Sequence, residues 1–253
     1  LSFTIDKLNF KNNLGFDVQD LKTEFIFSND QIELKNTKLI YFDSEINGDF
    51  TIDLTKFSNK DFNSVRDLDS INIKIEIYDS KIVPADLNSI NKKNTISNFD
   101  FWNFELSLEG PVNDFIINKF NLSSGTELLS FNGSLSNITG NNPNLSFELK
   151  QIEINSSSST INSIFPNVFG SVIPSSVKNL GNFNFNGDIL FNKSEIKSDF
   201  VLGVDKGIIK SSLNVLDFSN IDNSSYSGSV QGFNVDISRF LNFKSIRNTN
   251  FDF

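Results

Sequence analysis

Hydrophobic and polar residues alternate along most of this chain. Phe183, Phe185 and Phe191 fall on one parity of the sequence, while asparagine and aspartate occupy most of the positions between them. A period of two is typical of a β-strand that has one face out of water and one face in it. The alternation resumes over residues 200–204 and stops at residues 205–207, Asp-Lys-Gly, which is a turn signal. This stretch therefore predicts antiparallel strands joined by tight turns.

The same alternation recurs from one end of the chain to the other. Its apolar members are largely Phe, Ile, Leu and Val, which pack well on the pleated surface of a sheet. A bias in genome composition can favour Phe over Leu, but it cannot place Phe on alternate positions. We predict an antiparallel all-β protein whose strands include residues 3–6, 50–54, 71–78, 102–108, 145–149, 183–191, 200–204 and 233–237.

Glycine recurs within these strands in an apolar-x-Gly-x-apolar pattern. Residues 46–50 read INGDF and residues 185–189 read FNGDI, and three further examples begin at residues 108, 131 and 226. A glycine on the apolar parity of a strand leaves room for a bulge, a bend or the close approach of another segment. We therefore expect the sheet to be curved.

Three interruptions separate the groups of strands, at residues 57–68, 83–99 and 159–180. In the third, apolar residues from Ile161 to Val172 follow helical spacing, which predicts a pair of short amphipathic helices that Pro166 and Gly170 keep short. We expect residues 1–253 to be one continuous β segment, with internal breaks near 84–100 and 156–180. Because the sequence starts at Leu1 without Met, it is most simply a piece of a longer chain.

Composition excludes several classes of function. The net charge of -9 and the pI near 4.6 argue against a nucleic-acid-binding protein, because such binding needs clustered Lys and Arg. The chain has no Cys and no His, so thiol chemistry, imidazole catalysis and the usual zinc sites are not available. No apolar run is long enough to span a membrane as a helix. We expect no metal and no cofactor.

Carboxylates are the remaining candidates for catalysis. Asp49, Asp53, Glu105 and Asp188 could in principle pair as they do in glycosidases. Nearly all of the chain's strand carboxylates lie on the polar parity, however, where a solvated sheet face is the ordinary explanation. We expect no catalytic residues and no enzymatic activity.

Three stretches of the chain, residues 34–54, 174–215 and 225–242, resemble the bacterial translocation and assembly module family, TamB, within the AsmA-like group. The resemblance is carried by residues 174–215, with Leu180, Gly181, Gly187, Phe200 and Gly207 at family-like places. It is also carried by residues 225–242, SYSGSVQGFNVDISRFLN, which are similar to the family's Tyr-x-Gly strand followed by a short helix. A third stretch is LKNTKLIYFDSEINGDFTIDL, residues 34–54.

The resemblance implies a long, open, U-shaped antiparallel sheet, with short helical insertions and a hydrophobic groove that carries phospholipid between the inner and outer membranes. It further implies a periplasmic location, a parent chain anchored in the inner membrane, and contact through the parent with an outer-membrane barrel protein during outer-membrane protein assembly. The phospholipid acyl chains would contact Ile71, Ile73, Ile75, Ile77, Phe104, Leu106, Leu108, Phe183, Phe185, Ile189, Phe191, Phe200, Leu202 and Val204.

Two alternatives use the same alternation without a lipid. In a closed β-sandwich, two sheets about 10 Å apart would cover each other's apolar faces and no groove would exist. Composition alone favours this reading, whereas the resemblance and the repeated hairpins without a Greek-key signal favour one long sheet. The second alternative is an adhesin-like scaffold with a filled interior.

Overall fold

A computed structural model describes residues 1–11, 17–55, 71–89, 100–138, 145–164, 180–205, 207–218, 224–236 and 248–253. Strands account for most of these residues, as the alternation predicted. Their bounds are β1 (Ser2–Ile5), β2 (Phe10–Lys11), β3 (Asp17–Phe27), β4 (Gln31–Tyr41), β5 (Ser44–Asp53), β6 (Asn72–Ile82), β7 (Trp102–Pro111), β8 (Asp114–Ser124), β9 (Glu127–Ser136), β10 (Ser146–Ser157), β11 (Asn182–Phe191), β12 (Glu195–Val204), β13 (Gly207–Leu216), β14 (Ser225–Asp236) and β15 (Asn248–Asp252).

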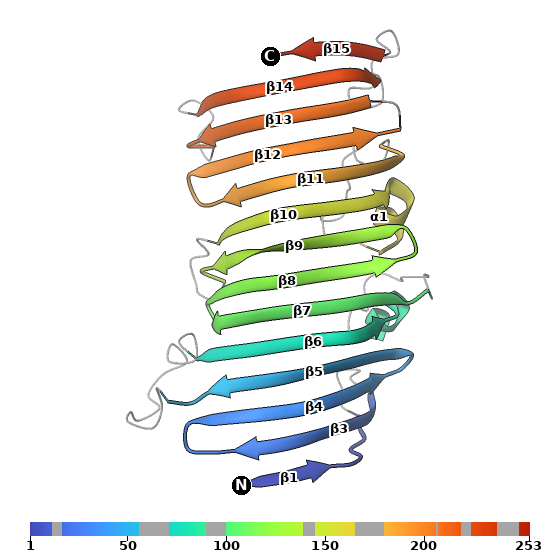
Figure 1. The fold of residues 1–253 in the computed structure, drawn as a ribbon, viewed down its shortest axis with the longest axis vertical. Helices are drawn as coiled ribbons and strands as arrows, with labels where there is room; N and C mark the ends of the chain where they lie inside the picture. The colour runs from blue at the N-terminus through green and yellow to red at the C-terminus, as the bar shows by residue number, and fades with distance from the viewer. Residues whose placement is uncertain are drawn as a thin grey trace. The chain divides into compact units, whose positions relative to one another are not determined.

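The strands form one open antiparallel sheet, which confirms the predicted fold class. The hydrogen-bonded order follows the sequence from β1 through β3 to β15 (Figure 1). The short β2 pairs with β3 beside this path. Among the residues that the structure describes, every strand belongs to this one sheet. A sandwich requires two stacked sheets, so the described strands do not form the closed alternative.

The chain divides into two compact units. Unit 1 comprises residues 1–124 and 133–143, and unit 2 comprises residues 125–132 and 144–253. Strands β1 to β8 lie in unit 1 and strands β10 to β15 lie in unit 2, so each unit contains a run of strands that pair with their neighbours in sequence. The two units are described separately below.

Both units contain the same structural feature, a β-bulge whose backbone N–H is bonded by an aspartate of the next strand. We call this aspartate the capping aspartate. In β4, Asn36 has a φ of 50°, and its backbone N–H donates a 2.7 Å hydrogen bond to Asp49 Oδ1 of β5. In β10, Gln151 has a φ of 51°, and its backbone N–H donates a 2.8 Å hydrogen bond to Asp188 Oδ1 of β11. A bulge inserts one extra residue and increases the local twist of a strand pair.

The sequences around the two bulges are also alike. Asn36 and Gln151 each follow Glu-Leu-Lys, and the two capping aspartates each follow Asn-Gly. The glycine of each Asn-Gly-Asp lies against the next strand, since a Cβ on Gly48 would come within 2.5 Å of the Glu76 carbonyl oxygen. The apolar-x-Gly-x-apolar pattern at residues 46–50 and 185–189 therefore marks a repeated three-strand arrangement, β4-β5-β6 in unit 1 and β10-β11-β12 in unit 2.

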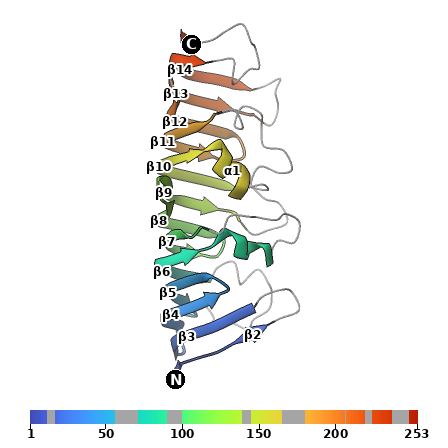
Figure 2. The ribbon, with the colours of Figure 1, turned by 90° about the vertical axis from the view of Figure 1, so that its right-hand side faces the viewer.

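Helical structure is confined to short segments. A 3-10 helix, η2, covers Pro84–Ser89 after β6, and α1 covers Ser158–Ile164 directly after β10 (Figure 2). Helix α1 lies inside the region predicted to form two short helices, and the second of these lies outside the described residues. The Ser157 side-chain oxygen accepts a hydrogen bond from the Thr160 backbone N–H at 3.1 Å, which caps the start of α1.

Candidate functional site

Apolar side chains of unit 1 line up in a row that crosses seven strands. Strand pairing places residues of adjacent strands directly opposite each other, so their side chains share one face of the sheet. The row runs in register from β1 to β8 through Phe3, Phe25, Leu34, Phe50, Ile75, Leu108 and Ile117. Because neighbouring strands are about 4.8 Å apart, it forms a continuous apolar band perpendicular to the strands.

Unit 2 has two comparable rows on one face. The first crosses β10 to β13 through Ile154, Phe185, Leu202 and Ile209, and continues to Gly232 and Phe251. The second crosses β10 to β14 through Phe147, Phe191, Ile196, Val215 and Tyr226. Ring stacking supports the packing along the face, with 5.2 Å between the ring centroids of Phe185 and Phe200 and 5.1 Å between those of Phe147 and Phe191.

The side chains in these rows are mostly half-buried. Of the described residues, few large hydrophobic side chains are buried, and Phe183, Ile152 and Val235 are those of unit 2. Neighbours along a row lie against each of its side chains, and most of these side chains keep an intermediate exposure to solvent. Each unit therefore presents apolar surface of the kind that marks an interaction site in a soluble protein.

The structure brings together the residues predicted to contact acyl chains, within each unit. In unit 1, Ile75 opposes Leu108 and Ile77 opposes Leu106, with Phe104 opposite Ser80 on the same face. In unit 2, Phe183 opposes Val204, Phe185 opposes Leu202 and Phe200 opposes Gly187. Phe183 is buried, and the remaining predicted residues are half-buried: Ile71, Ile73, Ile75, Ile77, Phe104, Leu106, Leu108, Phe185, Ile189, Phe191, Phe200, Leu202 and Val204.

Several members of the apolar rows were not predicted. Leu34 and Phe50 of β4 and β5, and Ile209 of β13, occupy central places in the rows. The alternation around each of them is visible in the sequence. What could not be read from one strand is which residue of the next strand lies opposite it, and this register decides whether apolar positions form a row.

Polar groups interrupt the apolar face of unit 1. The hydroxyls of Thr23 and Thr37 are buried and lie 2.8 Å apart, so each provides the other with a hydrogen-bond partner. Trp102 is 5% exposed, and its indole nitrogen has no hydrogen-bond partner. The Thr23–Thr37 pair satisfies its own polar groups, so most of the face can contact an apolar ligand without leaving donors unpaired.

The opposite face of unit 1 carries charges in pairs. Lys119 Nζ lies 2.8 Å from Glu105 Oε2, and Asn121 donates to the same oxygen at 3.1 Å. These hydrogen bonds, from Lys119 first and Asn121 second, hold the pKa of Glu105 below its usual value. A carboxylate with such partners is stabilised in its charged form and has a structural role.

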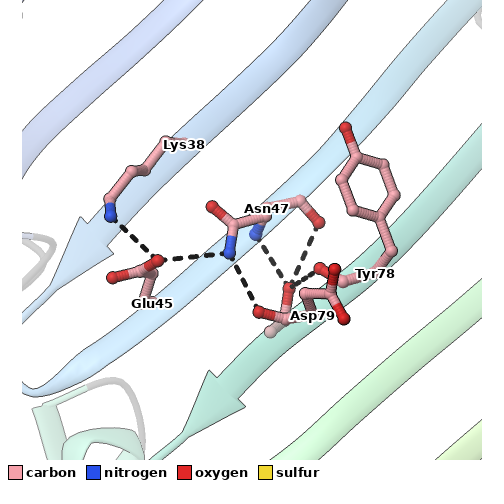
Figure 3. A network of polar contacts seen from close by, with 6 residues as sticks. Lys38, Glu45, Asn47, Tyr78 and Asp79 are labelled. Atoms are coloured by element: carbon pink, nitrogen blue, oxygen red, sulfur yellow. Dashed lines mark hydrogen bonds and ion pairs between the residues drawn. The ribbon is translucent and has the colours of Figure 1, made fainter.

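A second polar network joins β4, β5 and β6 on unit 1 (Figure 3). Lys38 lies 2.9 Å from Glu45, and Asn47 donates to Glu45 at 3.2 Å and to the Asp79 carbonyl oxygen at 3.0 Å. The bonds from Lys38 and then Asn47 lower the pKa of Glu45. The backbone N–H of Asn47 donates to the buried Ser80 hydroxyl at 2.8 Å. This side-chain bond connects β5 to β6 at the point where the register of the two strands shifts.

Partial desolvation raises the pKa of Tyr78 in the same region. The charges of Asp49 and Asp79 act in the same direction, because a tyrosinate beside carboxylates is unfavourable. Tyr78 is therefore a neutral phenol at physiological pH.

Each candidate catalytic carboxylate has a structural partner. Asp49 and Asp188 cap bulges, and Glu105 pairs with Lys119 as described above. Asp53 Oδ1 accepts bonds from the Thr55 backbone N–H at 2.8 Å and from the Thr55 hydroxyl at 2.6 Å. Within the described part of the chain, no three acidic side chains come together as metal ligands would.

Comparisons with protein-family models, curated proteins and solved structures gave no match. The resemblance to the TamB family therefore stays a prediction made from the sequence. Among the described segments, no helix has both the length and the apolar character that crossing a membrane requires.

Proposed function

We propose that the apolar face of each unit binds acyl chains of phospholipids. The observation that carries this proposal is the alignment of mostly half-buried apolar side chains into rows that cross β1 and β3 to β8 in unit 1 and β10 to β13 in unit 2. An acyl chain laid along such a row would remove apolar surface from water, which contributes roughly 25 cal/mol for each Å² buried. No charged side chain occupies these rows.

The family resemblance gives the proposal its cellular setting. The chain would be part of a periplasmic protein whose parent is anchored in the inner membrane and which carries phospholipid between the inner and outer membranes. Contact of the parent with an outer-membrane barrel protein, in support of outer-membrane protein assembly, belongs to the same proposal. In this role the protein is a conduit rather than an enzyme.

The test places a charge on the apolar face of unit 2. Phe200→Asp and Leu202→Asp introduce a carboxylate into the path, and Val201→Asp is the matched control, because Val201 lies between them on the opposite face and is 38% exposed. Because the two target sites are half-buried, each target variant should remain folded with a loss of about 1–2 kcal/mol. Native mass spectrometry after incubation with phosphatidylethanolamine vesicles measures bound phospholipid.

We expect phospholipid on the wild-type protein and on the Val201→Asp variant, and little or none on the other two, because a charge in an apolar path is costly to desolvate. Equal lipid binding by all four proteins would contradict the proposal. So would a wild-type protein that carries no lipid. If Phe200→Asp and Leu202→Asp both unfold, this face of unit 2 is needed for folding and is not an open binding surface, which would also contradict the proposal.

A further inference from the structure

A hollow of about 680 Å³ lies on unit 2, and its lining includes Phe183 and Val204 of the apolar face together with residues of the opposite face. Five of its lining residues form one straight row across β10 to β14, in the order Asn155, Asn184, Gly203, Ile208 and Phe233. With strands about 4.8 Å apart, the row is roughly 19 Å long. The chemistry of this row changes from amide to apolar along its length.

Glycine forms the floor of the hollow. A Cβ on Gly203 would overlap the side-chain amide of Asn184, which shows that this amide lies across the glycine. Any larger residue at this position would displace the amide and fill the middle of the row. The absence of a side chain at Gly203 therefore leaves the space that the Asn184 amide occupies in the middle of the row.

The apolar end of the hollow is an exposed aromatic platform. Phe233 is 48% exposed and Ile208, directly opposite it, is 45% exposed. Lys210 Nζ lies 5.8 Å from the centroid of the Phe233 ring, a cation-π contact that helps to hold the ring. Large exposed apolar side chains on an otherwise polar strand face are candidates for ligand contact.

The polar end of the hollow carries amides. Asn155 Nδ2 donates a 2.8 Å hydrogen bond to the Thr126 carbonyl oxygen, which fixes the orientation of that amide before any ligand arrives. Asn182 and Asn184 of β11 line the same end, and Asp205 adds a carboxylate at the turn after β12. An amide offers both donors and an acceptor, so it can bind a hydroxyl in either role.

We propose that this hollow binds a neutral saccharide of at least two sugar rings. Its C–H face would pack on Phe233, and its hydroxyls would bond to Asn155 and Asn184. The described lining contains no Lys or Arg, and the carboxylate of Asp205 lies on it, although Lys210 contacts the Phe233 ring at the apolar end; this balance disfavours a phosphate or carboxylate ligand. An acyl chain fits poorly as well, because it would leave the amides unpaired. The row that would contact the saccharide lies on the face opposite the apolar rows, although Phe183 and Val204 of the apolar face also line the hollow.

The experiment titrates the protein with maltose, cellobiose, lactose and di-N-acetylchitobiose and measures affinity by isothermal calorimetry and by NMR shifts. Phe233→Ala removes the platform, and Gly203→Leu fills the floor. Phe253→Ala is the matched control, because Phe253 is an exposed aromatic residue of unit 2 that does not line the hollow. Far-UV circular dichroism and thermal melting show which variants are folded.

We expect at least one of the four disaccharides to bind the wild-type protein and the Phe253→Ala variant with equal affinity. Phe233→Ala should raise the Kd at least about tenfold, because it removes the stacking surface. If Gly203→Leu does not fold, Asn184→Ala replaces it and should also weaken binding. Failure of all four disaccharides to bind the wild-type protein would overturn the proposal. Unchanged affinity in the folded Phe233→Ala variant would overturn it as well.

Discussion

Single side chains set the local path of the strands in both units. The aspartates of the two Asn-Gly-Asp sequences each accept a hydrogen bond from the backbone N–H of a residue with positive φ on the preceding strand. Non-glycine residues rarely adopt positive φ, and the conformation persists only where its surroundings hold it. Two of the four candidate carboxylates, Asp49 and Asp188, therefore hold the backbone of a bulge.

This explanation predicts a stability difference between two aspartates that oppose each other in the sheet. Asp188 caps the Gln151 bulge, whereas Asp199 lies opposite Asp188 on β12 and is exposed. Asp188→Ala should lower the free energy of unfolding by about 1–2 kcal/mol, because a charge-assisted hydrogen bond is lost. Asp199→Ala should change it by less than about 0.5 kcal/mol. Urea unfolding measures both, and equal effects would show that the cap contributes nothing.

At the scale of the strands, close approach between neighbours explains the recurring glycines. In unit 2, a Cβ on Gly187 would lie 2.6 Å from the Cα of Phe200 on β12. In unit 1, a Cβ on Gly48 would lie 2.5 Å from the Glu76 carbonyl oxygen on β6. Both glycines are adjacent to a capping aspartate. The Asn-Gly-Asp sequence therefore joins three strands, with the aspartate bonded to one neighbour and the glycine packed against the other.

Adding one methyl group at Gly187 tests this arrangement. Gly187→Ala should destabilise the protein by about 2–4 kcal/mol, because the β11–β12 backbones must separate to admit the Cβ. Gly125→Ala is the control for added bulk, since nothing lies within 4 Å of its Cβ position and its φ of 58° should cost only about 1 kcal/mol. Thermal melting of both variants gives the comparison. A Gly187→Ala variant as stable as the Gly125→Ala variant would contradict the proposed contact.

At the scale of the whole molecule, nearly all contacts between strands join strands that follow each other in the sequence. Each long strand pairs with the strands that precede and follow it, as in repeat proteins whose stability is a sum of neighbouring interactions. Such chains need not unfold in one step, and the two compact units give the simplest division.

The single tryptophan allows this division to be measured. Trp102 belongs to unit 1, so its fluorescence reports that unit alone, whereas far-UV circular dichroism reports the strands of both. We expect the two signals to give different urea midpoints, with m-values below those of a 253-residue protein that unfolds in one step. Superimposable transitions with a full-size m-value would show that the two units unfold together.

The sequence alone determined the strands and the apolar positions on them. Alternation is a local property, since successive side chains of a strand point to opposite faces, and it correctly marked the strand that carries Phe183 and Phe185 and the end of the following strand at Val204. The Asn-Gly-Asp sequences were visible too, but only as places where a bulge or close contact could form. Sequence reasoning also identified Asp49 and Asp188 without revealing what they bind.

Tertiary structure decided which residues meet across strands. The register that aligns Leu34 with Phe50 and Ile75, or Asn184 with Gly203 and Ile208, depends on turn lengths and bulges, and a shift of one residue would exchange the two faces. For the same reason, neither the apolar rows nor the hollow could be read from single strands. Side-chain alternation follows from the sequence of each strand alone, whereas a surface that crosses several strands exists only once their pairing is fixed.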